Sequence, residues 1–169
     1  MLDQVLFAAT VLALLGSAMI SGVFFSFSSF ILTALSRIPA ANAIAAMQAM
    51  TSAIKGPLFL VLFFGTAALA GVLGIAAPIK WSEAGSGYLL LGSLLFLNGP
   101  FGVTLLKNVP LNNKLAAMSP KSQAASRFWD EFRPVWGLWN HVRWIGSLAA
   151  AASFLMALVE GGAPLPARD

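Results

Sequence analysis

The sequence predicts an all-α integral membrane protein, a four-helix bundle with two short interfacial helices on the cytoplasmic side. Its 169 residues are 59% hydrophobic and only 9% charged. In soluble domains about a quarter of the residues are charged. Four apolar runs are each long enough to cross about 30 Å of hydrocarbon. Because these runs use most of the chain, we expect one domain and no second one.

The expected domain covers residues 1–162, with spans at about 2–35, 58–77, 87–106 and 135–159, followed by a flexible tail at 163–169. The first run is much longer than the ~7–15 apolar residues of a signal peptide, which favours a retained span. Ser17, Ser21 and Ser28 share one stripe of this span. Small hydroxyl residues let a neighbouring helix approach closely and can form hydrogen bonds across the contact.

Two segments between the spans predict the interfacial helices. The alanine-rich segment from Arg37 to Lys55 has apolar residues at helical spacing, but it is too short and too weakly apolar to cross a membrane. The second begins at Ser119-Pro120, where serine suits the N-cap and proline the first turn. Arg133-Pro134 is expected to end it, because proline lacks the N–H that continues a helix.

Prolines also shape the middle spans. Pro57 suits the first turn of the second span, Pro78 ends it, and the short connection after it makes the third span antiparallel to the second. Within the third span, Asn98-Gly99-Pro100 predicts a kink. Carbonyls freed inside a membrane must face protein or water, so Asn98 is a candidate pocket residue. Residues 108–114 are interpreted as a polar turn.

The fourth span opens on residues 134–146, which hold three of the five tryptophans and the only histidine. At about 100° per residue, Trp136, Asn140 and Arg143 share one helical stripe. Trp139 lies at the edge of this stripe, and His141 points nearly the opposite way.

Basic residues predict the orientation. The two long connections and the span ends beside them hold most of the ten lysines and arginines, whereas the opposite side holds only Lys80 and Arg168. By the positive-inside rule the long connections are cytoplasmic and both termini lie outside, with the bacterial inner membrane as the expected location. Because the basic residues lie between spans and not along one face, we expect the bilayer, and no nucleic acid, as the partner.

The composition also bears on cofactors. Cysteine is absent, which excludes disulfides, iron–sulfur clusters and a cysteine nucleophile. One histidine without clustered carboxylates cannot form an ordinary metal shell, so we expect no metal and no cofactor.

The candidate site lies at the cytoplasmic ends of the third and fourth spans, where Asn108 and Asn112 come near Asn140 and Arg143. The spans themselves contain no acidic residue that could pair with Arg143. Its guanidinium therefore extends to the interface, bonds neutral groups or the acidic residues just before the span, or binds an anionic ligand. His141 is either a base with a pKa near neutrality or an interface residue.

Four segments together resemble the anthrone oxygenase-like family: Ser21–Phe25, Ala46–Met50, Asn108–Asn112 and Trp139–Arg143. This family of small four-span membrane proteins was long catalogued as a domain of unknown function. Its fungal polyketide-pathway members oxidise anthrones to anthraquinones with molecular oxygen and no known cofactor. The resemblance implies that Asn108, Asn112, Trp139, Asn140 and Arg143 form the shared site.

Two functions stay open at this point. As a cofactor-independent oxygenase of a hydrophobic aromatic substrate, the protein would use Trp136 and Trp139 to stack the rings. Arg143, Asn140 and Asn112 would stabilise an enolate oxygen, while His141 or water takes the proton and molecular oxygen is the co-substrate.

The alternative is a non-enzymatic membrane protein that binds a lipid or quinone-like ligand, or an accessory subunit of a larger complex. Its tryptophans and arginine would then be interfacial anchors. A homo-oligomer is compatible with either function.

The orientation can be tested with a tag fused after Asp169. We expect an impermeant reagent to label the tag from outside intact cells, because both termini are placed there. Labelling only from the cytoplasm would show that the topology is inverted.

Overall fold

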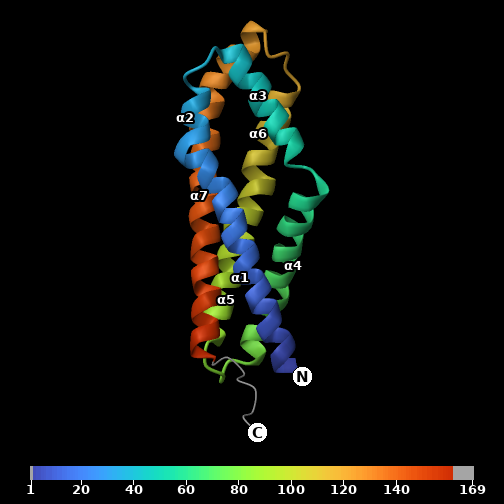
Figure 1. Cartoon of the computed structure of the whole chain (residues 1–169), viewed down its shortest axis with the longest axis vertical. Helices are drawn as coiled ribbons and strands as arrows, with labels where there is room; N and C mark the ends of the chain where they lie inside the picture. The colour runs from blue at the N-terminus through green and yellow to red at the C-terminus, as the bar shows by residue number, and fades with distance from the viewer. Residues whose placement is uncertain (1, 162–169) are drawn as a thin grey trace.

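The computed structural model describes residues 2–161, and within them the chain forms helices and no strand (Figure 1). The elements are α1 (Leu2–Ser26), η1 (Phe27–Ile31), α2 (Leu32–Leu35), α3 (Ala40–Ala53), α4 (Pro57–Ile79), α5 (Ser86–Phe96), η2 (Leu97–Gly102), η3 (Thr104–Asn108), α6 (Val109–Ala116) and α7 (Gln123–Glu160). The three η segments are π-helical turns.

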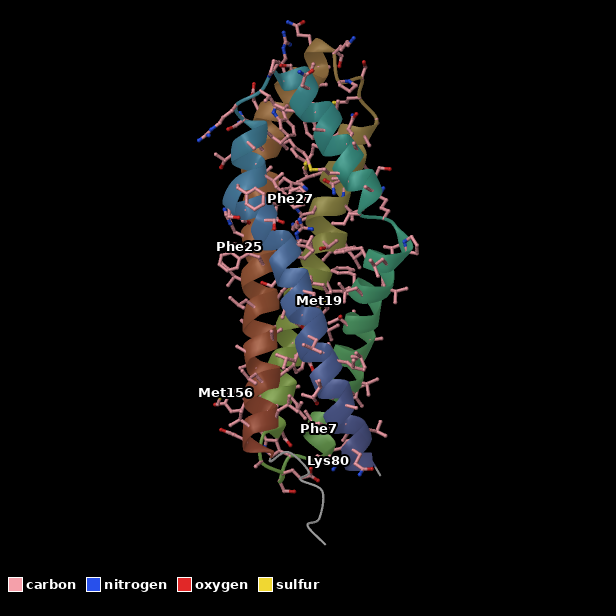
Figure 2. All side chains as sticks on the ribbon, viewed as in Figure 1. Phe7, Met19, Phe25, Phe27, Lys80 and Met156 are labelled. Atoms are coloured by element: carbon pink, nitrogen blue, oxygen red, sulfur yellow. The ribbon has the colours of Figure 1, made fainter. Side chains whose placement is uncertain are left out.

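Among the described residues, four helical stretches are long and apolar enough to cross a membrane: Gln4–Leu35, Pro57–Ile79, Ser86–Ala116 and Gln123–Glu160. The start of α1 and the end of α7 lie at one end of the bundle, and α3 lies at the other (Figure 1). Phe25 and Met156 point away from the bundle, as expected for residues that face lipid (Figure 2). The predicted all-α four-span fold is therefore confirmed, whereas no finding places a helix at the interface.

The expected break at Arg133-Pro134 is wrong. Pro134 lies inside α7, which has 38 residues and is about 57 Å long at 1.5 Å per residue. Phe132 and Trp136, on either side of Pro134, are both buried in one hydrophobic cluster. Packing on both sides of the proline thus keeps the helix continuous, and the segment predicted as a second interfacial helix is the first part of α7.

The polar turn expected at 108–114 is also wrong, because η3 and α6 continue the third span to Ala116. Gln48 on α3 explains how this helix ends. Its Nε2 donates to the carbonyl oxygens of Leu115 at 2.8 Å and Met118 at 2.9 Å, which lie at the end of α6 and just beyond it. The Gln48 side chain therefore satisfies backbone carbonyl groups that the end of a helix leaves without partners.

Two clusters of buried residues form the core. The cap cluster joins α3, α6 and the first part of α7 with the end of the first span. Its members are Phe27, Leu35, Ala43, Ile44, Met47, Leu115, Ala125, Phe128, Trp129, Phe132 and Trp136. The bundle cluster fills the space between the four spans. Its members are Ala13, Ile20, Phe24, Phe63, Ala67, Ala70, Leu73, Phe96, Ala150 and Phe154.

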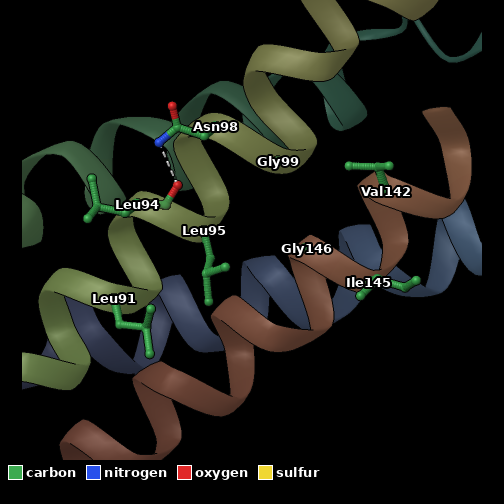
Figure 3. A pocket seen from close by; sticks show the side chains of 8 residues that line it. All are labelled: Leu91, Leu94, Leu95, Asn98, Gly99, Val142, Ile145 and Gly146. Atoms are coloured by element: carbon green, nitrogen blue, oxygen red, sulfur yellow. Dashed lines mark hydrogen bonds between the residues drawn. The ribbon is translucent and has the colours of Figure 1, made fainter.

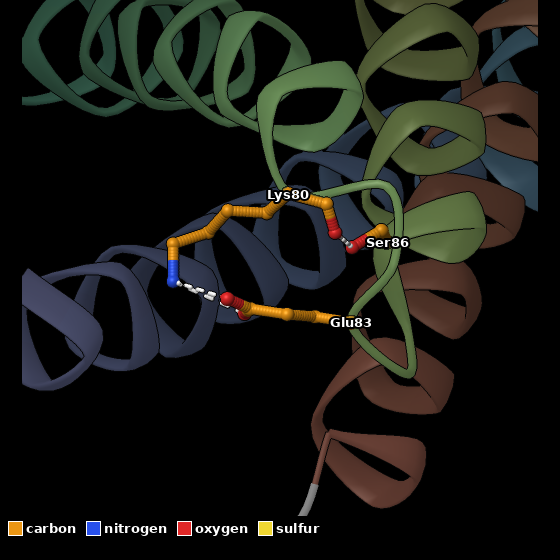
Figure 4. Close-up of polar contacts among 3 residues, drawn as sticks. All are labelled: Lys80, Glu83 and Ser86. Atoms are coloured by element: carbon orange, nitrogen blue, oxygen red, sulfur yellow. Dashed lines mark hydrogen bonds and ion pairs between the residues drawn. The ribbon is translucent and has the colours of Figure 1, made fainter.

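A short connection between α4 and α5 makes these helices antiparallel, as predicted. Lys80 Nζ lies 2.8 Å from a carboxylate oxygen of Glu83, and Ser86 Oγ donates to the carbonyl oxygen of Lys80 at 2.5 Å (Figure 4). Gly85 has a φ of +85°, which glycine adopts without strain. These local bonds close the turn, and Pro78 is accommodated in the last turn of α4.

Close packing of α5 on α7 generates a test. A Cβ atom on Gly92 would lie 2.8 Å from the Phe154 ring, whereas one on Gly71 would meet nothing within 4 Å. We expect Gly92→Val to destabilise the bundle by about 1–3 kcal/mol through overpacking. Gly71→Val, the matched control, should leave the thermal midpoint in detergent nearly unchanged. Equal midpoints for the two variants would contradict this packing.

Candidate functional site

A chain of buried polar side chains connects α7 to the first span. Asn140 is fully buried, and its Nδ2 donates to the carbonyl oxygen of Phe24 and to Ser28 Oγ, each at 2.7 Å. Its Oδ1 accepts a hydrogen bond from Arg143 Nη2 at 2.7 Å. One asparagine therefore uses both ends of its amide to hold the arginine against α1 and η1.

Arg143 has only neutral partners among the described residues. Its side chain is 4% exposed, and Nη1 donates to Thr104 Oγ1 at 3.3 Å. The guanidinium carbon lies 4.1 Å from the ring centroid of Phe24 and 5.0 Å from that of Trp136, so aromatic faces contribute cation–π attraction. Nε is buried without a hydrogen-bond acceptor. No salt bridge found in residues 2–161 includes Arg143.

Asn108 and Asn112 both bond Trp136, the residue whose ring lies against Arg143. The Trp136 indole Nε1 donates to Asn112 Oδ1 at 2.8 Å, and Asn108 Nδ2 donates to the Trp136 carbonyl oxygen at 3.3 Å. Asn108 Oδ1 is buried without a partner. The two asparagines thus fix the ring that covers one side of Arg143, and neither forms a hydrogen bond to its guanidinium.

π-helical turns hold Ser28 and Thr104, which bond Asn140 and Arg143, and also Asn108. Ser28 lies in η1, and both Thr104 and Asn108 lie in η3. A π-helical turn is wider than an α-helical one and often marks a functional position. Pro100 in η2 accounts for the first irregular turn of the third span, because it cannot donate to the preceding turn. The predicted kink is therefore a series of widened turns.

Three predicted site residues lie apart from this polar chain. His141 is exposed, and its Nδ1 accepts a hydrogen bond from Trp144 Nε1 at 3.2 Å. Trp139 is half-buried, with Lys107 Nζ 5.1 Å from its ring centroid. Asn98 is exposed, so the structure does not bring these three side chains together with Arg143.

Asn98 belongs to a different surface, an apolar groove of about 410 Å³ between the third span and α7 (Figure 3). Its Nδ2 donates to the carbonyl oxygen of Leu94 at 2.8 Å, one turn earlier on its own helix. Gly99 and Gly146 lie at the closest approach of the two helices, where a Cβ on Gly146 would be 3.4 Å from the Cα of Gly99. Asn98 thus lies on the outer face of the helix.

Sequence reasoning missed two partners of Arg143. Phe24 was not singled out, because a phenylalanine in a span is indistinguishable from any lipid-facing or core residue. Thr104 is a lone hydroxyl in an apolar stretch, which is a weak signal. Ser28 was found as part of the hydroxyl stripe, and Ser21 of the same stripe donates to the Trp144 carbonyl oxygen at 3.0 Å. Within the described residues, no group of three or more His, Asp or Glu could hold a metal ion.

Comparison with known proteins places the chain in a family. The model of the anthrone oxygenase family matches residues 59–153, which is more than half of the chain. The matched stretch contains Thr104, Asn108, Asn140 and Arg143. No curated protein and no solved structure matches the chain.

The neutral environment of Arg143 predicts an order of stabilities. Asn140→Ala removes the 2.7 Å acceptor and leaves a buried charge less well solvated, so we expect a loss of about 3–5 kcal/mol. Arg143→Met removes the charge and leaves only neutral groups unpaired, for a loss of about 1–3 kcal/mol. Thermal melting in detergent checks the order, with exposed Arg127→Met as control. A larger loss for Arg143→Met would indicate that the arginine serves mainly to stabilise the bundle.

Proposed function

Since the chain belongs to the anthrone oxygenase family, we propose that it is a membrane-embedded, cofactor-independent oxygenase of anthrone-like or other hydrophobic aromatic substrates. One observation carries the proposal beyond family membership: among residues 2–161, the buried Arg143 guanidinium has only neutral hydrogen-bond partners. A buried cation without a carboxylate is suited to stabilise negative charge that develops on a substrate.

The reaction begins with loss of a proton from the ring CH₂ group that lies across from the anthrone carbonyl. This loss leaves an enolate whose negative charge lies largely on the carbonyl oxygen. Molecular oxygen then adds to the carbanionic carbon, the peroxide anion takes back the proton that the base removed, and the resulting hydroperoxide loses water. The net change is anthrone plus O₂ to anthraquinone plus H₂O, so one oxygen atom enters the substrate and the other leaves as water.

Arg143 is assigned the enolate oxygen. Of its two hydrogen bonds, the one to Thr104 is longer, at 3.3 Å against 2.7 Å for the bond to Asn140. A substrate oxygen would therefore replace Thr104 more readily, while Asn140 keeps the guanidinium in place. The unpartnered Nε offers a further donor. Because Arg143 is enclosed, the substrate must separate neighbouring side chains as it enters from the bilayer.

The described side chains offer a weaker candidate for the base than for the group that binds the enolate oxygen. His141 is exposed on α7 and its Nδ1 already accepts the Trp144 hydrogen bond. We therefore assign proton removal to water, aided by the acidity that Arg143 confers on the substrate. Trp136 and Phe24, whose rings lie on the guanidinium, would flank the substrate oxygen.

The proposal is tested with purified protein and emodin anthrone under air, by following quinone absorbance and oxygen consumption. We expect oxidation clearly faster than the spontaneous rate, and a fall of about 100-fold or more in Arg143→Met, because one transition-state donor contributes about that much. Arg127→Met, an exposed arginine on the same helix, should retain full activity.

No acceleration by the native protein would exclude this activity. A rate in Arg143→Met equal to that of the native protein would remove the arginine from the mechanism.

A further inference from the structure

A second, mixed polar and apolar groove lies between the first span and α7. It has a volume of about 580 Å³, which is within the range of about 300–1,000 Å³ found for small-molecule sites. Ser28 and Leu32 line it from the first span, and Gly137, Leu138 and His141 line it from α7. The function proposed above assigns nothing to this groove.

We propose that this groove is where the oxygenase substrate docks before it moves inward to Arg143, and that the substrate is a flat apolar molecule with an oxygen-bearing edge that first meets Arg133 and His141. The inference rests on the proposed function for the identity of the ligand. The groove itself is defined by side chains that play no part in holding Arg143, except for Ser28.

Unused hydrogen-bond donors give the groove a polar edge. The Arg133 guanidinium has five N–H donors, and the hydrogen bond found for it among the described residues uses one, on Nη2, which lies 3.2 Å from Asp130 Oδ1. His141 adds a second donor. Because the Trp144 indole can only donate, the Nδ1 atom that accepts from it carries no hydrogen, and Nε2 of the neutral ring must carry one. Both side chains therefore suit a carbonyl or phenolic oxygen.

Apolar residues give the groove its flat part. Leu32 and Leu138 line it from opposite helices. Gly137 has no side chain, which allows the helices to come close. A Cβ on Gly137 would lie 3.3 Å from Leu32 Cδ1 and would reduce the available space. A planar ring system fits such a surface better than a bulky or highly polar group.

Ser28 connects the groove to the candidate site. It lines the groove and also bonds Asn140, whose oxygen holds Arg143. Two hydrogen bonds, from Asn140 to Ser28 and from Arg143 to Asn140, thus connect the wall of the groove to the guanidinium. This continuity favours the substrate of the same site over an unrelated ligand.

The charge of the groove argues against a phospholipid headgroup. Asp130 forms a salt bridge with Arg133 and places a carboxylate beside its guanidinium. A phosphate would meet this carboxylate as well as the guanidinium, whereas a neutral carbonyl or phenol needs only the free donors.

The test measures binding separately from turnover. The full-length protein in phosphatidylcholine nanodiscs is titrated with emodin, a quinone of the product type that cannot be oxidised further by this reaction, and the saturable shift of its visible absorption is compared with empty discs. Leu138→Trp should fill the groove and weaken binding about tenfold or more. Leu148→Trp is the control, since Leu138 is 60% exposed and Leu148 52% exposed on the same helix.

Arg133→Gln provides an independent variant and should weaken binding about tenfold, as expected for loss of a charged donor. Unchanged binding in both Leu138→Trp and Arg133→Gln would overturn the proposal. So would a shift no larger than that of empty discs, or loss of emodin binding when phosphatidylglycerol replaces phosphatidylcholine, which would make a lipid headgroup the occupant. Groove-dependent binding without any anthrone oxidation would support the docking site while excluding the oxygenase, so the two failures are distinguishable.

Discussion

The burial of the Arg143 guanidinium constrains the rest of the molecule. A charged side chain inside an apolar bundle is stable only where its N–H donors find acceptors and the neighbouring side chains leave room for it. Asn140 does this with a single amide, whose oxygen binds Arg143 and whose N–H groups bind the Phe24 carbonyl and Ser28. Because those two acceptors are about one turn apart on the first span, the hydrogen bonds fix how α1 and α7 are aligned along their axes.

The guanidinium also lies where the two clusters of the core meet. Trp136, which belongs to the cap cluster, contacts one side of it, and Phe24, which belongs to the bundle cluster, contacts another. The cap cluster depends in turn on α3, whose Gln48 binds the end of α6. A ligand that reaches Arg143 must therefore separate the two clusters or enter from the side, between the first span and α7.

This arrangement connects the family membership to specific chemistry. The segment matched by the anthrone oxygenase family supplies the arginine, its asparagine and the threonine, whereas α1 and η1, which precede that segment, supply the Phe24 ring and Ser28. The surroundings of Arg143 thus depend on a helix outside the matched stretch. The hydrogen bonds that join the two parts are neutral, and in the proposed reaction they leave the positive charge of Arg143 available to an anionic intermediate.

The sequence by itself determined the four spans, because composition and the length of apolar runs reflect the thickness of the bilayer. Helical periodicity also placed Asn140 and Arg143 on one face, and the acidic residues lie outside the expected spans or, for Asp3, at the outer end of one. Only the tertiary structure decided that Pro134 and residues 108–114 stay helical, since packing of the cap cluster on both sides outweighs local preference. It alone placed Phe24 and Thr104 against Arg143, because periodicity defines which residues share a face, as it did in setting His141 apart from Arg143, but not which helix lies opposite.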